Sequence, residues 1–323
     1  MPKAIRIHKN GGPEVLQWEE VPVGDPGPNE ARVRHHSVGL NYIDVYFRSG
    51  IYPVQLPAGL GMEAAGVVDA VGPGVTNVRP GDRVAYASPP NGAYSEVRNM
   101  PADRLVDLPE GISFEQGAAM LLQGITVQYL IKRTYKVQRG DTVLFHAAAG
   151  GVGLIACQWL NAIGATVIGT AGSDEKAALA KAHGCHHTIN YRRENFVDRV
   201  KEITGGAGVP VVYDGVGKDT FQGSLDCLST FGMMVSFGNS SGSVPPVDIA
   251  KVCRGSLYLT RPSIVTYTAK RDDLIAGAKD LFDVVLSGRM KIDVNQRYPL
   301  REVAQAHRDL EARKTTGSTV LVP

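Results

Sequence analysis

Short apolar runs separated by glycine- and proline-containing turns dominate residues 1–122. Residues 31–35 (ARVRH) and 66–71 (GVVDAV) have the composition of short strands, and turns are predicted at 25–28, 72–74 and 79–82. Closely spaced strands joined by tight turns are typical of a compact, barrel-like domain. The pattern therefore predicts a β-rich domain at the start of the chain.

From Phe114 onward, apolar segments of strand length alternate with segments of helical spacing. This alternation predicts a parallel sheet with helices on both faces. After it, helices at 271–287 and 301–313 and a strand at 318–322 are expected to return to the first domain. The strands of the sheet are predicted at 142–146, 165–170, 187–190, 210–214, 232–237 and 257–260, and its helices near 115–134, 151–163, 174–183, 194–204 and 219–229.

The run from His146 to Gly153 (HAAAGGVG) lies between a predicted buried strand and a helix with one apolar face. Its A-x-x-G-x-x-G spacing lets the backbone approach a pyrophosphate at the positive end of the helix. Alone the motif is weak, because other α/β proteins also contain glycine-rich turns. The strand at 164–170 completes a β-α-β unit of the expected length. We therefore expect a dinucleotide-binding Rossmann domain over 123–265, inserted into a domain formed by 1–122 and 266–323.

The end of the second Rossmann strand indicates which dinucleotide would bind. NAD-binding proteins usually place an acid there, against the adenosine ribose, but the segment 168–173 (IGTAGS) ends without one. Ser173 and Lys176 follow instead, and Tyr191, Arg192 and Arg193 come after the third strand. A small hydroxyl and cations suit a 2′-phosphate, which favours NADP(H). The alternative is that these cations are ordinary solvated charges.

Residues 232–242 (GMMVSFGNSSG) are interpreted as a buried strand that opens into a glycine-rich loop. The carboxyl end of such a strand faces the ligand crevice of a doubly wound sheet, so this loop could flank the nicotinamide. A plain turn is the alternative interpretation.

Residues 39–66 carry a cluster of aromatic and polar side chains. Tyr42 and Phe47 are explained equally well as core residues. The better candidates for a flat apolar pocket with polar handles are Tyr46 and Tyr52, beside Asn41 and Asp44.

Composition narrows the class of protein. The 323 residues include 34 basic and 32 acidic side chains, and a net charge of +2 gives poor support for a dedicated nucleic-acid binder. The four cysteines lack C-x-x-C spacing, which argues against a disulfide framework and a cysteine-rich zinc site, so each is expected to be a small core residue. We see neither a signal-peptide pattern nor an apolar stretch long enough to span a bilayer, so a cytoplasmic protein is expected.

The chain resembles the medium-chain dehydrogenase/reductase superfamily, and within it the zinc-free NADPH:quinone oxidoreductase (zeta-crystallin-like) branch. Zinc members carry a cysteine near position 41 and a histidine before the glutamate of a Gly-His-Glu motif, whereas this chain has Asn41 and Met62 there. The short segment 91–96 (NGAYSE) replaces the four-cysteine lobe, so neither a catalytic nor a structural zinc site is expected. Matching segments run along the whole chain, at 11–16 (GGPEVL), 41–50, 81–84 (GDRV), 147–158 and 235–240 (VSFGNS).

The resemblance implies a fold, a cofactor and a set of site residues. The fold is a doubly wound parallel Rossmann sheet inserted in a β-rich, GroES-like barrel domain, and the cofactor is NADPH. The substrate is placed near Asn41, Tyr46 and Tyr52. The cofactor is placed on Asn41, Asp44, Gly150, Gly151, Val152, Gly172, Ser173, Lys176, Tyr191, Phe237, Gly238, Asn239 and Ser240.

We therefore expect an NADPH-dependent quinone reductase, in which a flat acceptor receives a hydride and polar groups stabilise its developing oxyanion. Reduction of enones or alkenals with the same cofactor is the alternative, and it would need a proton donor such as Tyr46 or Tyr52. A third interpretation is a non-catalytic role, as a crystallin-like structural protein or a single-strand RNA binder, and the near-neutral charge counts against RNA. The apolar segment 256–260, at the predicted sheet edge, indicates a homodimer formed by pairing of edge strands.

Overall fold

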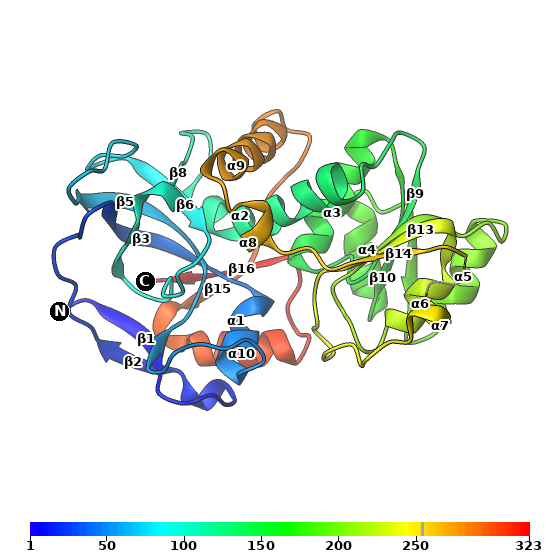
Figure 1. Cartoon of the computed structure of the whole chain (residues 1–323), viewed down its shortest axis with the longest axis horizontal. Helices are drawn as coiled ribbons and strands as arrows, with labels where there is room; N and C mark the ends of the chain where they lie inside the picture. Colours follow the sequence, from blue (N-terminus) through cyan, green and yellow to red (C-terminus); the bar gives the residue numbers. More distant parts are fainter. Residues whose placement is uncertain (253–254) are drawn as a thin grey trace. The chain divides into compact units, whose positions relative to one another are not determined.

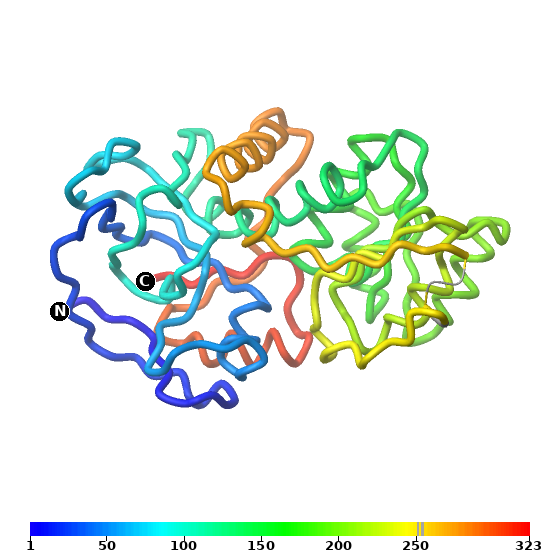
Figure 2. The backbone as a smooth tube through the Cα atoms, viewed as in Figure 1, coloured from blue at the N-terminus to red at the C-terminus, as the bar shows by residue number. Residues whose placement is uncertain are grey.

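The computed structural model describes residues 1–252 and 255–323 and divides them between two compact units. Unit 1 consists of residues 1–125, 268–286 and 292–323, and unit 2 consists of residues 126–267 and 287–291. The backbone leaves unit 1, builds unit 2 and returns, so both marked ends of the chain lie on unit 1 (Figures 1 and 2).

A six-stranded sheet forms the centre of unit 2 (Figure 1). Its strands are β9 (Thr142–Phe145), β10 (Thr166–Ala171), β11 (His187–Asn190), β12 (Val209–Asp214), β13 (Leu228–Ser236) and β14 (Tyr258–Thr260). They lie in the order β11-β10-β9-β12-β13-β14, and every neighbouring pair is parallel. The order reverses between β9 and β12, which is the switch point where such sheets bind ligands.

The connections from β9 to β13 contain the helices α3 (Gly151–Ile163), α4 (Asp174–Ala182), α5 (Phe196–Ile203) and α6 (Phe221–Asp226). Because crossovers between parallel strands are right-handed, α3 and α4 cover one face of the sheet and α5 and α6 cover the other. The members of each pair contact one another. The prediction of a doubly wound parallel sheet is confirmed.

Burial on both faces explains the apolar strands of this sheet. Val143, Leu144 and Phe145 of β9 are fully buried, and Leu144 joins Ile168, Val212 and Met234 in one core cluster. The unit also contains α7 (Ile249–Val252) and α8 (Ile264–Tyr267). Cys157, Cys185 and Cys227 are buried, as predicted, and Cys253 lies outside the described residues.

Two antiparallel systems build unit 1. A small sheet has the order β2-β1-β4, from β1 (Lys3–Ile7), β2 (Gln17–Glu20) and β4 (Ala58–Gly59). A larger sheet has the order β15-β16-β3-β5-β6-β8, with β7 also paired to β3, and only its β15–β16 pair is parallel. Its strands are β3 (Glu30–Leu40), β5 (Glu63–Val71), β6 (Arg83–Ala87), β7 (Val97–Pro101), β8 (Val106–Asp107), β15 (Val294–Pro299) and β16 (Ser318–Val322).

Helices α1 (Tyr42–Ser49), α9 (Arg271–Leu286) and α10 (Val303–Glu311) belong to unit 1, and α2 (Phe114–Tyr129) runs from unit 1 into unit 2. Short 3-10 turns lie at Pro13–Val15, Ala102–Arg104 and Leu300–Glu302. The core of this unit includes Ile5, Val33, Tyr86, Tyr94 and Leu321, so strands from both sheets and from the last segment of the chain share one interior.

Several elements differ from their predicted bounds. The helix predicted at 115–134 is α-helical only to Tyr129 and continues as a π-helical turn, Leu130–Thr134. The helix predicted at 219–229 is the shorter α6, because β13 already begins at Leu228. Within the described residues, none of the helices has the length and apolar character required to cross a membrane.

Candidate active site

The glycine turn of unit 2 follows β9 and leads into α3. Ala147 has a left-handed φ of 53°, and Gly150 is the N-cap of α3 in an extended conformation. Gly153 cannot be replaced without rearrangement, because a Cβ atom there would lie 2.6 Å from the carbonyl oxygen of Ala148. Gly151 and Val152, half-buried like Gly150, begin the first turn of α3, where N–H groups lack partners within a helix, whereas the Gly150 N–H donates to the Ala147 carbonyl at 2.9 Å. This turn can therefore receive a pyrophosphate.

The end of β10 contains the predicted 2′-phosphate site. Ser173 is the N-cap of α4, and its hydroxyl accepts a hydrogen bond from the Lys176 backbone N–H at 3.3 Å. A Cβ atom on Gly172 would lie 2.6 Å from the Tyr191 hydroxyl, so these two residues lie side by side. Tyr191 is 39% exposed and Lys176 is half-buried. Unit 2 thus brings Gly172, Ser173, Lys176 and Tyr191 together.

Asp174 is an acid at this position that the sequence interpretation passed over. Its carboxylate accepts a hydrogen bond from Asn190 Nδ2 at 2.7 Å and forms an ion pair with Arg193 at 2.6 Å. These contacts compensate its negative charge beside Ser173. The Arg193 side chain is 71% exposed and the Asp174 side chain 54%, so this ion pair is compatible with the alternative that Arg193 is an ordinary solvated charge.

The loop after β13 is fixed to the loop after β12. The Phe237 N–H donates to the Asp214 carbonyl at 2.8 Å, and the Ser240 N–H donates to the Gly215 carbonyl at 3.2 Å. Gly238 allows this approach, since a Cβ atom there would lie 2.5 Å from the Gly215 carbonyl oxygen. Phe237 and Ser240 are half-buried, whereas Gly238 and Asn239 are buried. The four predicted loop residues lie beside the carboxyl ends of β12 and β13, on the same edge of the sheet as the glycine turn.

A buried polar network, which sequence reasoning missed, lies beneath these loops. His146 contacts Thr170 Oγ1 through Nδ1 and Ser224 Oγ through Nε2, both at 2.9 Å. Asp214 accepts from Ser224 Oγ at 2.9 Å and from the Gly217 N–H at 3.0 Å. Burial lowers the pKa of His146, which keeps the ring neutral at neutral pH. The network ties together the ends of β9, β10 and β12, from which the cofactor loops emerge. The only sequence signal is that these polar residues end apolar strands.

The predicted site residues of unit 1 lie on and around α1. Asn41 is the N-cap of this helix, and its backbone N–H donates to Asp44 Oδ2 at 2.9 Å. Asn41 Nδ2 donates to Glu63 Oε2 at 2.6 Å, and Gln123 Nε2 donates to Asn41 Oδ1 at 3.2 Å. Burial raises the pKa of Glu63 to about 8 and the pKa of Asp44 to about 7, although N–H donors oppose both shifts. The two carboxyl groups can therefore hold protons near neutral pH.

Aromatic rings adjoin this polar cluster. The rings of Tyr46 and Tyr52 meet edge to face with centroids 5.2 Å apart, and those of Phe47 and Tyr52 meet similarly at 5.6 Å. Tyr46 is buried and Tyr52 half-buried. Asn41, Asp44 and Tyr46 thus share the first part of α1, and Tyr52 packs on Tyr46. Tyr42 and Phe47 are half-buried, and Phe47 packs against the core of unit 1.

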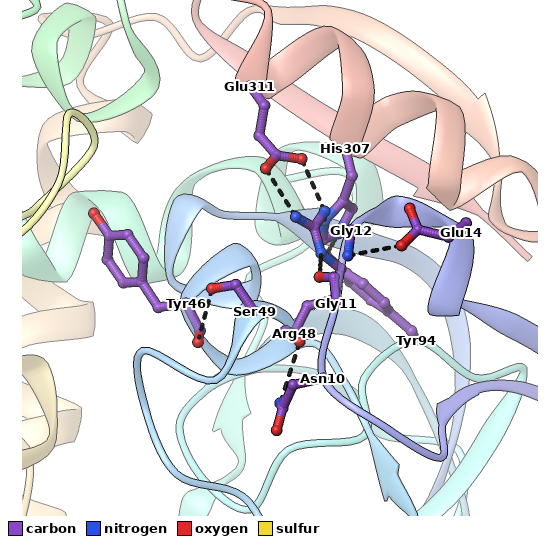
Figure 3. A network of polar contacts seen from close by, with 10 residues as sticks. All are labelled: Asn10, Gly11, Gly12, Glu14, Tyr46, Arg48, Ser49, Tyr94, His307 and Glu311. Atoms are coloured by element: carbon purple, nitrogen blue, oxygen red, sulfur yellow. Dashed lines mark hydrogen bonds and ion pairs between the residues drawn. The ribbon is translucent and has the colours of Figure 1, made fainter.

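A second network attaches α1 to α10 (Figure 3). The Arg48 guanidinium binds both carboxylate oxygens of Glu311 at 2.8 Å and donates to His307 Nδ1 at 2.9 Å. Because Arg48 can only donate, His307 accepts through Nδ1, and a neutral ring carries its proton on Nε2, 3.1 Å from the Tyr94 hydroxyl. Tyr94 in turn donates to Asp44 Oδ2 at 2.7 Å. Burial, aided by the charge of Arg48, lowers the pKa of His307 to about 3.

These contacts fix the side chain of Asp44, which in turn accepts a hydrogen bond from the Asn41 backbone N–H. Figure 3 shows the Tyr46 ring directed away from the Arg48 cluster, so α1 presents its aromatic and its ionic residues on different sides. Within residues 1–252 and 255–323, no group of three or more His, Cys, Asp and Glu side chains is arranged to hold a metal ion. At position 63, amide and backbone N–H groups surround the carboxyl group instead.

The fold and these two sets of residues define a class of protein. Residues 27–110 match the alcohol dehydrogenase GroES-like domain, and residues 151–280 match the zinc-binding dehydrogenase family. The chain belongs to the medium-chain dehydrogenase/reductase superfamily.

Full-length relatives narrow the assignment. The chain is 53% identical to a quinone oxidoreductase from Pseudomonas aeruginosa, with 100% of both chains covered. It is similar to the crystal structure of Escherichia coli quinone oxidoreductase complexed with NADPH, with a TM-score of 0.98, 52% identity, and coverage of 99% of this chain and 100% of that one. A 2-haloacrylate reductase from a Burkholderia species is 47% identical over 100% of this chain and 99% of its own length. Within the superfamily, the chain belongs to the zinc-free quinone oxidoreductase branch.

Proposed function

We propose that the protein reduces quinones by hydride transfer from NADPH, without zinc. The observation that carries this proposal is the 52% identity, over essentially the whole chain, to a quinone oxidoreductase crystallised with NADPH. The residues of both units agree with it. In this proposal, residues 123–265 form the cofactor domain, and residues 1–122 and 266–323 form the catalytic domain.

Unit 2 suits the cofactor in shape and charge. The close packing at Gly153 brings backbone N–H groups to the surface of the α3 turn, which suits a pyrophosphate. Ser173, Lys176 and Tyr191 would hold the 2′-phosphate, and the contacts of Asp174 with Asn190 and Arg193 would reduce the repulsion that this acid exerts there. Gly150, Gly151 and Val152 would bind the pyrophosphate, and the loop of Phe237, Gly238, Asn239 and Ser240 would flank the nicotinamide.

Unit 1 supplies the acceptor side of the reaction. When bound, NADPH provides the hydride. Asn41 is the candidate hydrogen-bond donor to the oxygen that becomes negative, and such a donor is most effective in a site from which water is excluded. Tyr46 and Tyr52 would form aromatic walls for a flat acceptor. Asp44, with its raised pKa and its contact with Asn41, can hold a proton close to this donor.

Initial rates with NADPH and a panel of benzoquinones, naphthoquinones and enones test the proposal. We expect fast oxidation of NADPH with quinones and no NADP-dependent oxidation of simple alcohols, because the Asn41 amide at the proposed acceptor site is a hydrogen-bond donor and not a base that could remove a hydroxyl proton. Tyr52→Ala should weaken acceptor use more than NADPH binding. Fast reduction of enones without any reduction of quinones would contradict the proposed substrate class.

Reduction of an activated carbon–carbon double bond is the second candidate function. The 47% identical 2-haloacrylate reductase favours it. That reaction needs a proton delivered to carbon, and Asp44, with its pKa raised to about 7, is a suitable reservoir. Incorporation of deuterium from the solvent into the product of 2-haloacrylate reduction would establish this activity.

A homodimer formed through β14 is also proposed. This strand lies at the edge of the unit 2 sheet, and Tyr258 and Leu259 are 59% and 42% exposed. An exposed apolar edge strand invites pairing, and pairing with a symmetry-related copy would continue the sheet. We also expect the protein to work in the cytoplasm, where buried thiols such as Cys157 and Cys185 stay reduced.

A further inference from the structure

The side chain of Asn41 is held from two sides by residues of different elements. Glu63 begins β5 and accepts from Asn41 Nδ2 at 2.6 Å, and Gln123 of α2 donates to Asn41 Oδ1 at 3.2 Å. All three side chains are buried, with exposures of 5% for Asn41, 0% for Glu63 and 6% for Gln123. A surface asparagine can rotate its amide freely, whereas this one is held in one orientation by its neighbours.

Ser318, Gln123, Asn41 and Glu63 form a chain of hydrogen bonds, and the direction of donation along it is set at Glu63. Glu63 Oε1 accepts the Leu122 backbone N–H at 2.7 Å, and Glu63 Oε2 accepts from Asn41. At the other end, Gln123 Oε1 accepts from the Ser318 hydroxyl at 2.9 Å. A serine hydroxyl can donate or accept, so Ser318 would tolerate either direction. Above its pKa of about 8, Glu63 is a carboxylate that can only accept, so the ionised form requires the nitrogen of Asn41 to face it.

We propose that Glu63 and Gln123 are positioning residues that keep the Asn41 amide turned so that a second Nδ2–H, rather than its oxygen, is available to the acceptor. This inference rests on the proposed function, in which Asn41 meets the developing oxyanion. An amide nitrogen has two hydrogens, and Glu63 takes one of them. If the amide rotated by half a turn, a carbonyl oxygen would occupy the donor position and would repel the oxyanion.

The substitution Glu63→Gln tests the direction of the hydrogen-bond chain separately from the packing of the side chain at position 63. The Leu122 N–H would hold the oxygen of the new glutamine, because a backbone N–H can only donate. The amide nitrogen of the glutamine would then face Asn41. The Asn41 amide would rotate so that its oxygen faces this nitrogen. Gln123 would turn as well, and the Ser318 hydroxyl would adapt. The variant keeps the volume and the hydrogen bonds of the chain but reverses its direction.

Steady-state kinetics with NADPH and a naphthoquinone, at a pH above the Glu63 pKa of about 8, provide the measurement. We expect Glu63→Gln to lower kcat by about 100-fold, as loss of one oxyanion donor does, with little change in the KM for NADPH. Gln123→Glu should lower kcat more than Gln123→Met, because a carboxylate there attracts the nitrogen of Asn41 toward the wrong side. Gln296→Met is the matched control, since Gln296 also bonds a hydroxyl of β16, at Thr319, but does not contact Asn41.

A pH profile adds a readout that packing alone would not change. Burial raises the pKa of Glu63, so its ionisation should make kcat rise with pH toward a plateau above about 8. The other titratable groups facing Glu63 are Asp44 and Tyr94, whose negative forms oppose its ionisation. The Glu63→Gln variant should lack this rise, while the control should retain it.

The outcomes separate this inference from the proposed function. If Asn41→Ala lowers kcat but Glu63→Gln retains kcat within about twofold and keeps the same pH profile, the positioning role is wrong and the function stands. If Asn41→Ala leaves kcat unchanged, Asn41 is not in the reaction, and the proposed site fails with it. Should Glu63→Gln not fold, equal kcat values for Gln123→Glu and Gln123→Met would overturn the positioning role.

Discussion

Two arginine–glutamate pairs in unit 1 have nearly the same geometry but different burial. Arg48 binds the two carboxylate oxygens of Glu311 at 2.8 Å each, and Arg297 binds those of Glu115 at 2.9 and 2.8 Å. The Arg48 side chain is 2% exposed, and the Arg297 side chain is 52% exposed. The variants Arg48→Met and Arg297→Met remove the same charge from these two environments and keep a side chain of similar length.

The expected loss of folding stability in Arg48→Met follows from the partners that it leaves without the arginine. Loss of one partner of a buried pair costs about 3–5 kcal/mol. Glu311 is 33% exposed and can be partly solvated, which favours the lower end of this range. The Gly11 carbonyl and His307 Nδ1 also lose a donor. A loss of about 3 kcal/mol corresponds to a decrease in Tm of roughly 6–12 °C for a unit of this size.

Thermal unfolding followed by circular dichroism at neutral pH provides the assay. Arg297→Met should leave Tm essentially unchanged, because water solvates both partners of an exposed pair. Raising the salt concentration should change the result for Arg48→Met little, because the Arg48 side chain is only 2% exposed. Equal decreases in Tm for the two variants would refute the argument from burial.

Three further predictions concern the cofactor, metals and assembly. Charge-assisted contacts are worth about 1.5–3 kcal/mol each, so NADPH should exceed NADH in kcat/KM by at least about tenfold, and Lys176→Ala should reduce this ratio mainly through KM; equal use of both cofactors by the unmodified protein would contradict the assignment. Activity should survive dialysis against a chelator, since Asn41 and Met62 replace a thiolate and an imidazole, and stoichiometric zinc with loss of activity on its removal would be the contrary result. Leu259→Asp places a charge on the exposed edge strand and should convert a dimer to a monomer in light scattering, whereas a monomeric unmodified protein would exclude the β14 interface.

The sequence predicted the Rossmann sheet well because its signals are local. The α3 helix and the strands β11 and β16 have the predicted bounds. In α3 and β16 the signal is an apolar run next to a glycine, Gly164 after α3 and Gly317 before β16. β15 was missed because its residues (VNQRYP) are polar and only half-buried at the edge of a sheet. Its hydrogen bonds to β16, the neighbouring strand of the sheet, make it a strand.

Sequence reasoning could predict only those residues of the candidate site whose type and spacing can be recognised along the chain. Helix α1 lies in a region predicted as β-rich, although Asn41 and Asp44 have the spacing of an N-terminal capping box. The aromatic residues that follow suggested a pocket and concealed the helical period. Glu63, Gln123 and His146 were not found as site residues, because their roles depend on contacts between residues distant in the chain.

Strand β16 lies inside its sheet, between β15 and β3, although it comes from the last segment of the chain. On the ribosome, β3 must wait for this partner while roughly 280 further residues are made, which takes about 15–60 s at ordinary elongation rates. Most of unit 2 is synthesised as one continuous stretch within that interval. During the wait, the end of β3 that pairs with β16, Val38 to Leu40, lacks this partner, so a nascent-chain chaperone would protect it from strands of other chains. Ser318 of β16 completes the hydrogen-bond chain to Asn41, so the acceptor side of the site can form only after β16 has been synthesised.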